Sequence, residues 1–171
     1  HLSRAFRRGL KRAGLASTGK HYPGHGAVTA DSHHELPVDR RSMAEIERCE
    51  LPPFAALIAD GLESIMTAHV RYTAVDDRPA SLSEHWVKDI LRKRLGFQGV
   101  VFTDDLSMGG AAAVGSMEDR ARLALAAGSD MLLVCNDRPA SVTLLDALRD
   151  VRPRPTASVR LHALYRRQEL S

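Results

Sequence analysis

Apolar and polar residues alternate along the chain in blocks that predict short buried strands separated by helices. The segments that predict strands are residues 15–20, 64–70, 99–103 and 131–135. Between them lie longer segments in which apolar residues recur with the period of a helix, roughly 3.6 residues. We therefore expect an α/β fold with four parallel strands and helices between them.

Local signals mark where the helices begin and end. Three sequences have the serine-to-acid spacing of a capping box, which satisfies free N–H groups at a helix start: Ser42-x-x-Glu45, Ser81-x-x-Glu84 and Ser116-x-x-Asp119. Glycine adopts the left-handed conformation that often ends a helix, and we expect this role for Gly14, Gly96 and Gly128. Further helices are expected at residues 2–14, 139–149 and 156–168.

The composition narrows the class of protein. The chain has 171 residues, of which 44% are hydrophobic and 5% aromatic, so one domain with an aliphatic core is expected. The formal net charge is +3 and no basic stripe is interleaved with aromatic residues, which argues against nucleic-acid binding. No apolar run is long enough to cross a membrane. Cys49 and Cys135 are predicted to be reduced thiols, as in a cytoplasmic protein.

Chemically reactive side chains are concentrated in residues 20–34. Lys20-His-Tyr-Pro-Gly-His-Gly26 is followed by Asp31-Ser-His33 and then by a further histidine. The proline and glycines do not suit a helix, and loops of this kind concentrate binding and catalytic residues. Lys20 and His21 are either hydrogen-bond donors for a polyhydroxylated ligand or ordinary surface side chains.

Asp31 and His33 are spaced so that the carboxylate can accept a hydrogen bond from the imidazole. Such a contact orients the ring and favours its charged form, so that His33 can act first as a general acid and then as a general base. The alternative is a solvated pair without a catalytic role. A metal site is not expected, because the His-x3-His spacing of residues 21 and 25 is useful mainly on a helix.

Asp104 and Asp105 follow the apolar segment 99–103. Adjacent side chains on a strand point to opposite sides of the sheet, so only one carboxylate can face the open end of the sheet. The alternative is that one carboxylate caps the next turn and the other is solvated, although an uncompensated carboxylate after a buried strand is costly. Because parallel α/β proteins bind ligands at the carboxyl edge of the sheet, we expect this pair to meet the histidine-rich segment there.

These motifs resemble those of bacterial β-N-acetylhexosaminidases of glycoside hydrolase family 3. The resemblance is carried by the motifs at residues 20–26 and 31–33 and by Phe102-Thr-Asp-Asp-Leu-Ser-Met108. Met66-Thr-Ala-His-Val70 and Pro79-Ala-Ser-Leu-Ser83 are similar to the family as well. The resemblance therefore spans nearly the whole chain in the correct order.

The resemblance implies a (β/α)8 barrel that acts as a retaining glycosidase with no cofactor and no metal. Asp104 matches the nucleophile, His33 the acid/base, Asp31 its partner, and Lys20 and His21 the residues that bind N-acetylglucosamine (GlcNAc). The implied substrate is a muropeptide or chitooligosaccharide with a non-reducing GlcNAc. The implied role is peptidoglycan recycling in the cytoplasm.

The chain is shorter than a full barrel, which typically needs about 250 residues and at least about 200. Residues 1–171 are therefore expected to form a single partial domain, the C-terminal four or so βα units, without the N-terminal half-barrel. The start at His1 also suggests a piece of a longer protein. Three alternatives remain open: a phosphorylase on the same scaffold, a non-catalytic half-barrel that binds its missing half or another copy, and a His/Asp metal hydrolase.

Overall fold

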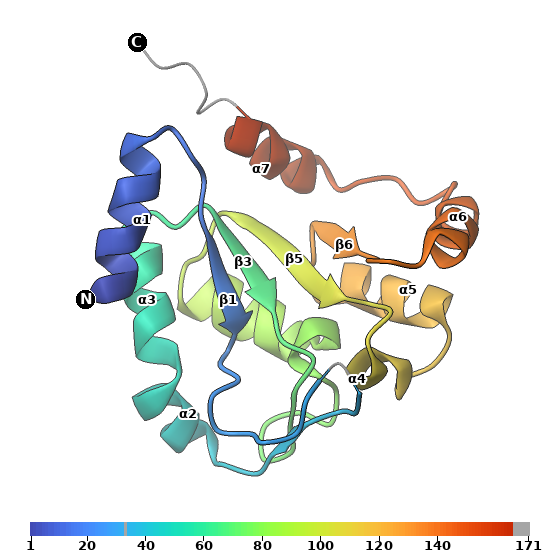
Figure 1. Cartoon of the computed structure of the whole chain (residues 1–171), viewed down its shortest axis with the longest axis horizontal. Helices are drawn as coiled ribbons and strands as arrows, with labels where there is room; N and C mark the ends of the chain where they lie inside the picture. The colour runs from blue at the N-terminus through green and yellow to red at the C-terminus, as the bar shows by residue number, and fades with distance from the viewer. Residues whose placement is uncertain (33, 166–171) are drawn as a thin grey trace.

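The computed structural model describes residues 1–32 and 34–165, which form an α/β fold around a parallel sheet (Figure 1). The main sheet has four strands in the order β1 (Thr18–Tyr22), β3 (Ser64–Thr67), β5 (Val100–Asp105) and β6 (Met131–Leu133). All neighbouring pairs are parallel. The predicted parallel sheet is confirmed, and each strand lies in or overlaps the segment that predicts it.

Two further strands, β2 (Val38–Asp39) and β4 (Arg71–Tyr72), pair in parallel as a separate small sheet. The Arg71 N–H also donates to the Pro37 carbonyl at 2.9 Å. These strands were not predicted, because two residues are too few to show a periodic pattern. They join the segment that follows residues 24–35 to the segment that follows β3.

Helices connect the strands and cover the sheet. Their bounds are α1 (Leu2–Arg12), α2 (Met43–Cys49), α3 (Leu51–Ala59), the 3-10 turn η1 (Ala80–Leu82), η2 (His85–Arg94), α4 (Gly109–Ala112), α5 (Met117–Ala127), α6 (Arg138–Ala147) and α7 (Pro155–Tyr165). Figure 1 shows α1 and α3 beside β1, with α5 and α6 towards β6. Within the described residues, no helix has both the length and the apolar character that crossing a membrane requires.

Two of the three predicted capping boxes are confirmed. Ser42 and Ser116 each accept a hydrogen bond from the backbone three residues later and open α2 and α5. The third prediction is wrong: Ser81 lies in η1 and its hydroxyl contacts His69 instead. The hydroxyl of Ser83, two residues before η2, instead accepts the Trp86 N–H at 3.1 Å. The predicted stops at residues 14, 96 and 128 are all glycines with positive φ.

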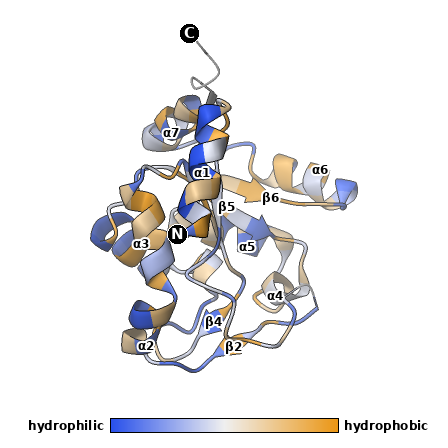
Figure 2. Ribbon diagram, turned by 60° about the vertical axis from the view of Figure 1, so that its left-hand side comes forward, coloured by the Kyte–Doolittle hydropathy of each residue, from blue (hydrophilic) through white to orange (hydrophobic). Residues whose placement is uncertain are grey.

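The main core is less aliphatic than the composition predicts. Trp86, Tyr22 and Tyr72 are fully buried. The centroid of the Trp86 ring lies 5.0 Å from that of Tyr72 and 6.3 Å from that of Tyr22. Figure 2 shows α3, which packs against β1, coloured mostly as hydrophobic. Tyr22 is the last residue of β1, so this packing fixes the strand end that carries His21.

Candidate active site

A surface pocket of about 520 Å³ lies at the carboxyl edge of the main sheet. It is lined by Lys20, His21, His25, Gly26, Asp31, Ser32 and Asp104. Nε2 of His21, on β1, lies 3.6 Å from Oδ2 of Asp104, on β5. The two polar segments therefore meet in space, as the sequence predicts.

Asp104 and Asp105 have different surroundings. Asp104 lines the pocket, and its Oδ1 accepts the Asp105 N–H at 2.8 Å. Asp105 points to the other side of the strand, where its carboxylate accepts the Ser107 N–H at 2.9 Å, the Ser107 hydroxyl at 2.7 Å and the Cys135 N–H at 3.0 Å. The prediction that only one carboxylate faces the open end of the sheet is confirmed.

The pKa of Asp105 reflects these contacts. Burial alone raises the pKa of this carboxyl, but the hydrogen bonds from Ser107 and Cys135 outweigh burial and lower the pKa below its ordinary value. Asp105 is therefore a structural anion that holds the turn together and joins it to the end of β6. We call residues 104–108 the acidic turn.

The histidine-rich loop (residues 24–35) rests on the start of α4. Nε2 of His25 lies 3.2 Å from the Ser32 hydroxyl, and the Gly110 N–H donates to the Ser32 carbonyl at 3.0 Å. A Cβ at Gly110 would lie 3.0 Å from the Ser32 carbonyl oxygen and 3.1 Å from that of Glu35. A side chain at this position would therefore push the two backbones apart by a few tenths of an ångström.

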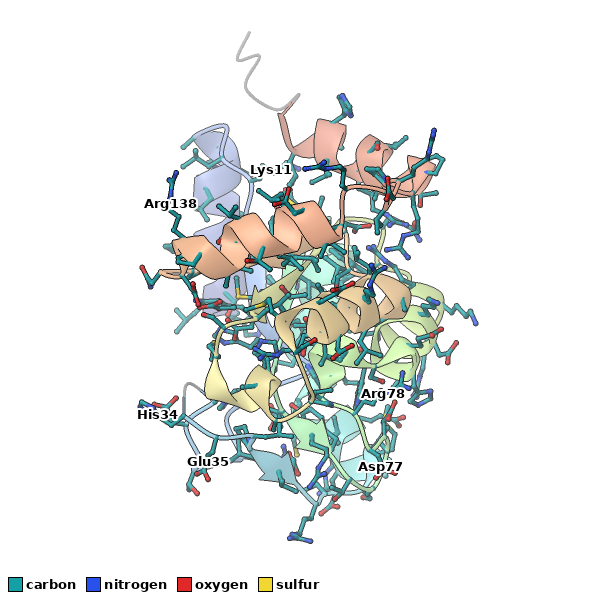
Figure 3. The ribbon with its side chains drawn as sticks, turned by 90° about the vertical axis from the view of Figure 1, so that its right-hand side faces the viewer. Lys11, His34, Glu35, Asp77, Arg78 and Arg138 are labelled. Atoms are coloured by element: carbon teal, nitrogen blue, oxygen red, sulfur yellow. The ribbon has the colours of Figure 1, made fainter. Side chains whose placement is uncertain are left out.

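The predicted Asp31–His33 pair is only half described, because His33 lies outside the described residues. Asp31 lines the pocket, and its Oδ2 is 4.0 Å from Nε2 of His34. Figure 3 shows His34 and Glu35 on the outer side of the loop, pointing away from the body of the protein. Lys20 and His21 lie inside β1, at its carboxyl end, and both line the pocket.

Sequence reasoning missed one polar side chain of the pocket and considered another only as a metal ligand. Ser32 was not singled out, although its position between Asp31 and His33 could have indicated it, and His25 was considered only as part of a His-x3-His metal pattern. Asn136 and Asp137 also follow a strand of the main sheet but do not line the pocket. Asp137 accepts the Ala140 N–H at 2.9 Å and caps α6.

The described pocket residues suit a hydroxyl-rich ligand and nucleophilic chemistry. Lys20 and His21 supply N–H donors beside the Asp104 carboxylate, an arrangement that can orient sugar hydroxyls next to an attacking oxygen. In the part of the chain that the structure describes, no group of three or more His, Cys, Asp or Glu residues is arranged to hold a metal ion.

Comparisons with known proteins all indicate the same family. The family model described as glycosyl hydrolase family 3 N terminal domain matches residues 1–158. A Beta-hexosaminidase of Methylococcus capsulatus is 48% identical over 168 residues, which cover 98% of this chain and 50% of that protein.

Solved structures agree with this result. NagZ from Neisseria gonorrhoeae in complex with N-trifluoroacetyl-D-glucosamine is 43% identical with a TM-score of 0.82, covering 95% of this chain and 46% of that one. A glycoside hydrolase family 3 β-N-acetylglucosaminidase from Paenibacillus sp. str. FPU-7 is 38% identical with a TM-score of 0.88. The match covers 94% of this chain and 32% of that one. The chain spans about half the length of the curated relatives it matches.

Proposed function

The chain belongs to glycosyl hydrolase family 3, and we propose that it carries the nucleophile and the acid/base of a retaining β-N-acetylhexosaminidase. The observation that carries the proposal is a pair of side chains from β1 and β5, which lie on either side of β3. His21 lies 3.6 Å from Asp104, in one pocket with Lys20 and Asp31. A carboxylate beside hydrogen-bond donors in a polar pocket is what nucleophilic glycoside hydrolysis requires.

In the proposed first step, Asp104 attacks the anomeric carbon of a non-reducing GlcNAc. Oδ1 of Asp104 accepts the Asp105 N–H, which leaves Oδ2, near His21, as the attacking oxygen. The electron pair of the glycosidic bond leaves with the aglycone oxygen, which takes a proton from His33. The product is a glycosyl ester on Asp104.

In the second step, water attacks the same carbon and gives its proton to His33, so that Asp104 is released as a carboxylate. Two inversions at one carbon give net retention of configuration. Asp31 supports the charged form of His33 in the first step. This use of an imidazole replaces the second carboxylate of the usual retaining arrangement.

The proposed substrate is a GlcNAc-containing muropeptide or chitooligosaccharide, hydrolysed in the cytoplasm. Lys20 and His21 donate hydrogen bonds to the hydroxyl and acetamido groups of the sugar. We further propose that residues 1–171 are a single partial (β/α)8 unit whose remaining strands complete the barrel and the sugar pocket. The activity then belongs to the intact protein.

A mechanism-based label tests this function. A fluorinated GlcNAc analogue with a good leaving group should form a stable glycosyl ester with the intact protein, and peptide mapping should locate the ester on Asp104. The Asp105→Asn variant keeps the Asp104 carboxylate, so it should still be labelled on Asp104, but more slowly than the wild type because the acidic turn is altered. A label on Asp105, or no label together with no hydrolysis of an aryl β-GlcNAc substrate, would overturn the proposal.

A phosphorylase on the same scaffold is the second candidate. The described pocket contains Lys20, His21 and His25, and an imidazole acid/base would not repel an incoming phosphate as a carboxylate would. Comparing turnover of the aryl substrate with and without inorganic phosphate separates the two functions. A hydrolase should release free GlcNAc at the same rate in both, whereas a phosphorylase should release the sugar phosphate only when phosphate is added.

A further inference from the structure

A buried histidine lies behind the acidic turn, outside the pocket lining. His69 follows β3 and is fully buried, as is its partner Ser81. Nε2 of His69 lies 3.0 Å from the Asp105 carbonyl oxygen, and Nδ1 lies 2.6 Å from the Ser81 hydroxyl. This contact is what removes Ser81 from the capping role that its sequence spacing predicts.

The chemistry of these contacts fixes the state of the ring. A carbonyl oxygen can only accept, so Nε2 of His69 carries the hydrogen. Burial lowers the pKa of His69 and so favours the neutral ring. The charge of Asp104 acts in the opposite direction but is the smaller effect. Nδ1 is then unprotonated and accepts the Ser81 hydroxyl hydrogen. The Asp105 carbonyl thus fixes the tautomer, and the bond from the Ser81 hydroxyl to Nδ1 holds the ring with its Nε2–H directed at that carbonyl.

Residue 105 joins this buried pair to the pocket. Its carbonyl is held by His69, its carboxylate by Ser107 and Cys135, and its N–H donates to Oδ1 of Asp104 at 2.8 Å. The contacts with His69, Ser107 and Cys135 thus hold residue 105 in place, and with it the direction of its N–H. That N–H in turn sets the orientation of the Asp104 carboxylate.

We propose that Ser81 and His69 are positioning residues that hold the Asp105 backbone so that its N–H orients Asp104 for attack. The inference rests on the proposed function, and it adds two residues to the site that do not touch the substrate. Without the Ser81 hydroxyl, the buried Nδ1 loses its partner, and the ring is no longer held with its Nε2–H directed at the Asp105 carbonyl oxygen. The turn relaxes and Asp104 loses its fixed orientation.

The main test compares Ser81→Ala with Ser83→Ala in the intact protein. Both serines are fully buried in the same segment, but Ser83 contacts Asp76 and Trp86 rather than His69. Ser81→Ala should lower kcat about ten-fold with KM nearly unchanged, as expected for losing one buried hydrogen bond. Ser83→Ala should lower the melting temperature and leave kcat unchanged.

Comparing turnover of substrates with good and poor leaving groups separates a positioning role from a purely structural one. Because positioning of the nucleophile affects every attack, Ser81→Ala should slow turnover of good and poor leaving groups equally. It should also slow labelling by the fluorinated analogue by the same factor. Slowing confined to poor leaving groups would instead indicate a defect in proton transfer and would overturn the inference.

A second pair of variants applies if Ser81→Ala does not fold. His69→Gln keeps an N–H that can reach the Asp105 carbonyl, whereas His69→Leu fills a similar volume without a donor. His69→Gln should retain at least about five times the kcat of His69→Leu, because only the leucine leaves this acceptor without its donor. Equal rates in this pair, or equal behaviour of the two serine variants, would overturn the inference in a wild type that hydrolyses GlcNAc substrates. A folded wild type with no such activity would overturn the proposed function as well.

Discussion

The acidic turn and the histidine-rich loop form one pocket but are held in different ways. In the acidic turn, Asp105 is bound through its carboxylate, carbonyl and N–H, and the next residue, Leu106, is fully buried. In the loop, Ser32 contacts His25 and Gly110, while the neighbouring residues Asp31 and 34–35 are exposed. The turn is anchored to β5 and β6, whereas the loop rests on a four-residue helix.

The difference matches the two proposed chemical roles. A nucleophile gains from a fixed position, since small displacements from the attacking geometry are costly in rate. An acid/base that must come close to the glycosidic oxygen after the sugar binds gains from a segment that can move. We therefore expect changes in the turn to act on stability and on every substrate, and changes in the loop to act on proton transfer.

The largest effect is expected for Asp104→Asn. The amide oxygen can still accept the Asp105 N–H, so the melting temperature should stay close to that of the wild type. Activity on an aryl β-GlcNAc substrate should fall about 1,000-fold or more, because the variant lacks the attacking carboxylate. Steady-state kinetics together with thermal unfolding measure both. Retained activity would show that the proposed nucleophile is wrong.

Asp31→Asn should have the next largest effect, and it should depend on the leaving group. General acid catalysis typically contributes about 100-fold or more, so turnover of a substrate with a poor leaving group should fall about 100-fold. An activated aryl leaving group needs little protonation and should be affected much less. Asp137→Asn, which alters a helix cap outside the pocket, is the control. An equal loss of turnover with both substrates would show that Asp31 does not support protonation of the leaving group.

Asp105→Ala tests the acidic turn through stability. The variant loses hydrogen bonds from Ser107 and Cys135 to a carboxylate, and the free energy of unfolding should fall by about 2–4 kcal/mol at neutral pH. Asp146→Ala removes only an exposed pair with Arg149 and should cost less than about 0.5 kcal/mol. Urea unfolding measures both.

The cost of Asp105→Ala should also depend on pH. The folded pKa of Asp105 lies below the value of an unfolded aspartate, which is about 3.9. Its contribution to the free energy of unfolding is therefore fully present above about pH 5 and is lost as the pH falls through the folded pKa. The difference between wild type and variant should shrink between pH 5 and pH 3. A constant difference would contradict the role of the carboxylate charge.

Gly110→Ala tests the support of the loop. The added Cβ would press on the carbonyl oxygens of Ser32 and Glu35, so the loop must shift by a few tenths of an ångström. Turnover of poor leaving groups should fall about five-fold, a modest share of the loss that misplaced catalytic groups can cause. Gly9→Ala, where no atom lies within 4 Å of the added Cβ, is the matched control on α1. Unchanged kinetics would show that the loop adjusts freely.

The sequence predicted what depends on local patterns and strand direction. The four strands follow from apolar segments, and the meeting of His21 with Asp104 follows from the common carboxyl edge of parallel strands. Ser81 was misread because its partner, His69, is distant in sequence and buried, which local spacing cannot indicate. The contact of the loop with Gly110 depends on the packing of two backbones, and the Gly109-Gly110 pair before an alanine-rich segment does not indicate that contact.

The smallest effect is expected for Ser32→Ala, and it addresses the difference between loop and turn directly. In the wild type, the Gly110 N–H bound to Ser32 should exchange with solvent faster than the Leu106 N–H, which donates to Leu133 at 2.8 Å. Removing the Ser32 hydroxyl loses the contact with His25, worth about 0.5–1 kcal/mol, so exchange at Gly110 should rise about two- to five-fold. Exchange at Leu106 should not change, because no part of its support passes through the loop. Equal protection of the two amides in the wild type would mean that turn and loop open together, and the contrast between a firmly held turn and a less firmly held loop would lose its physical basis.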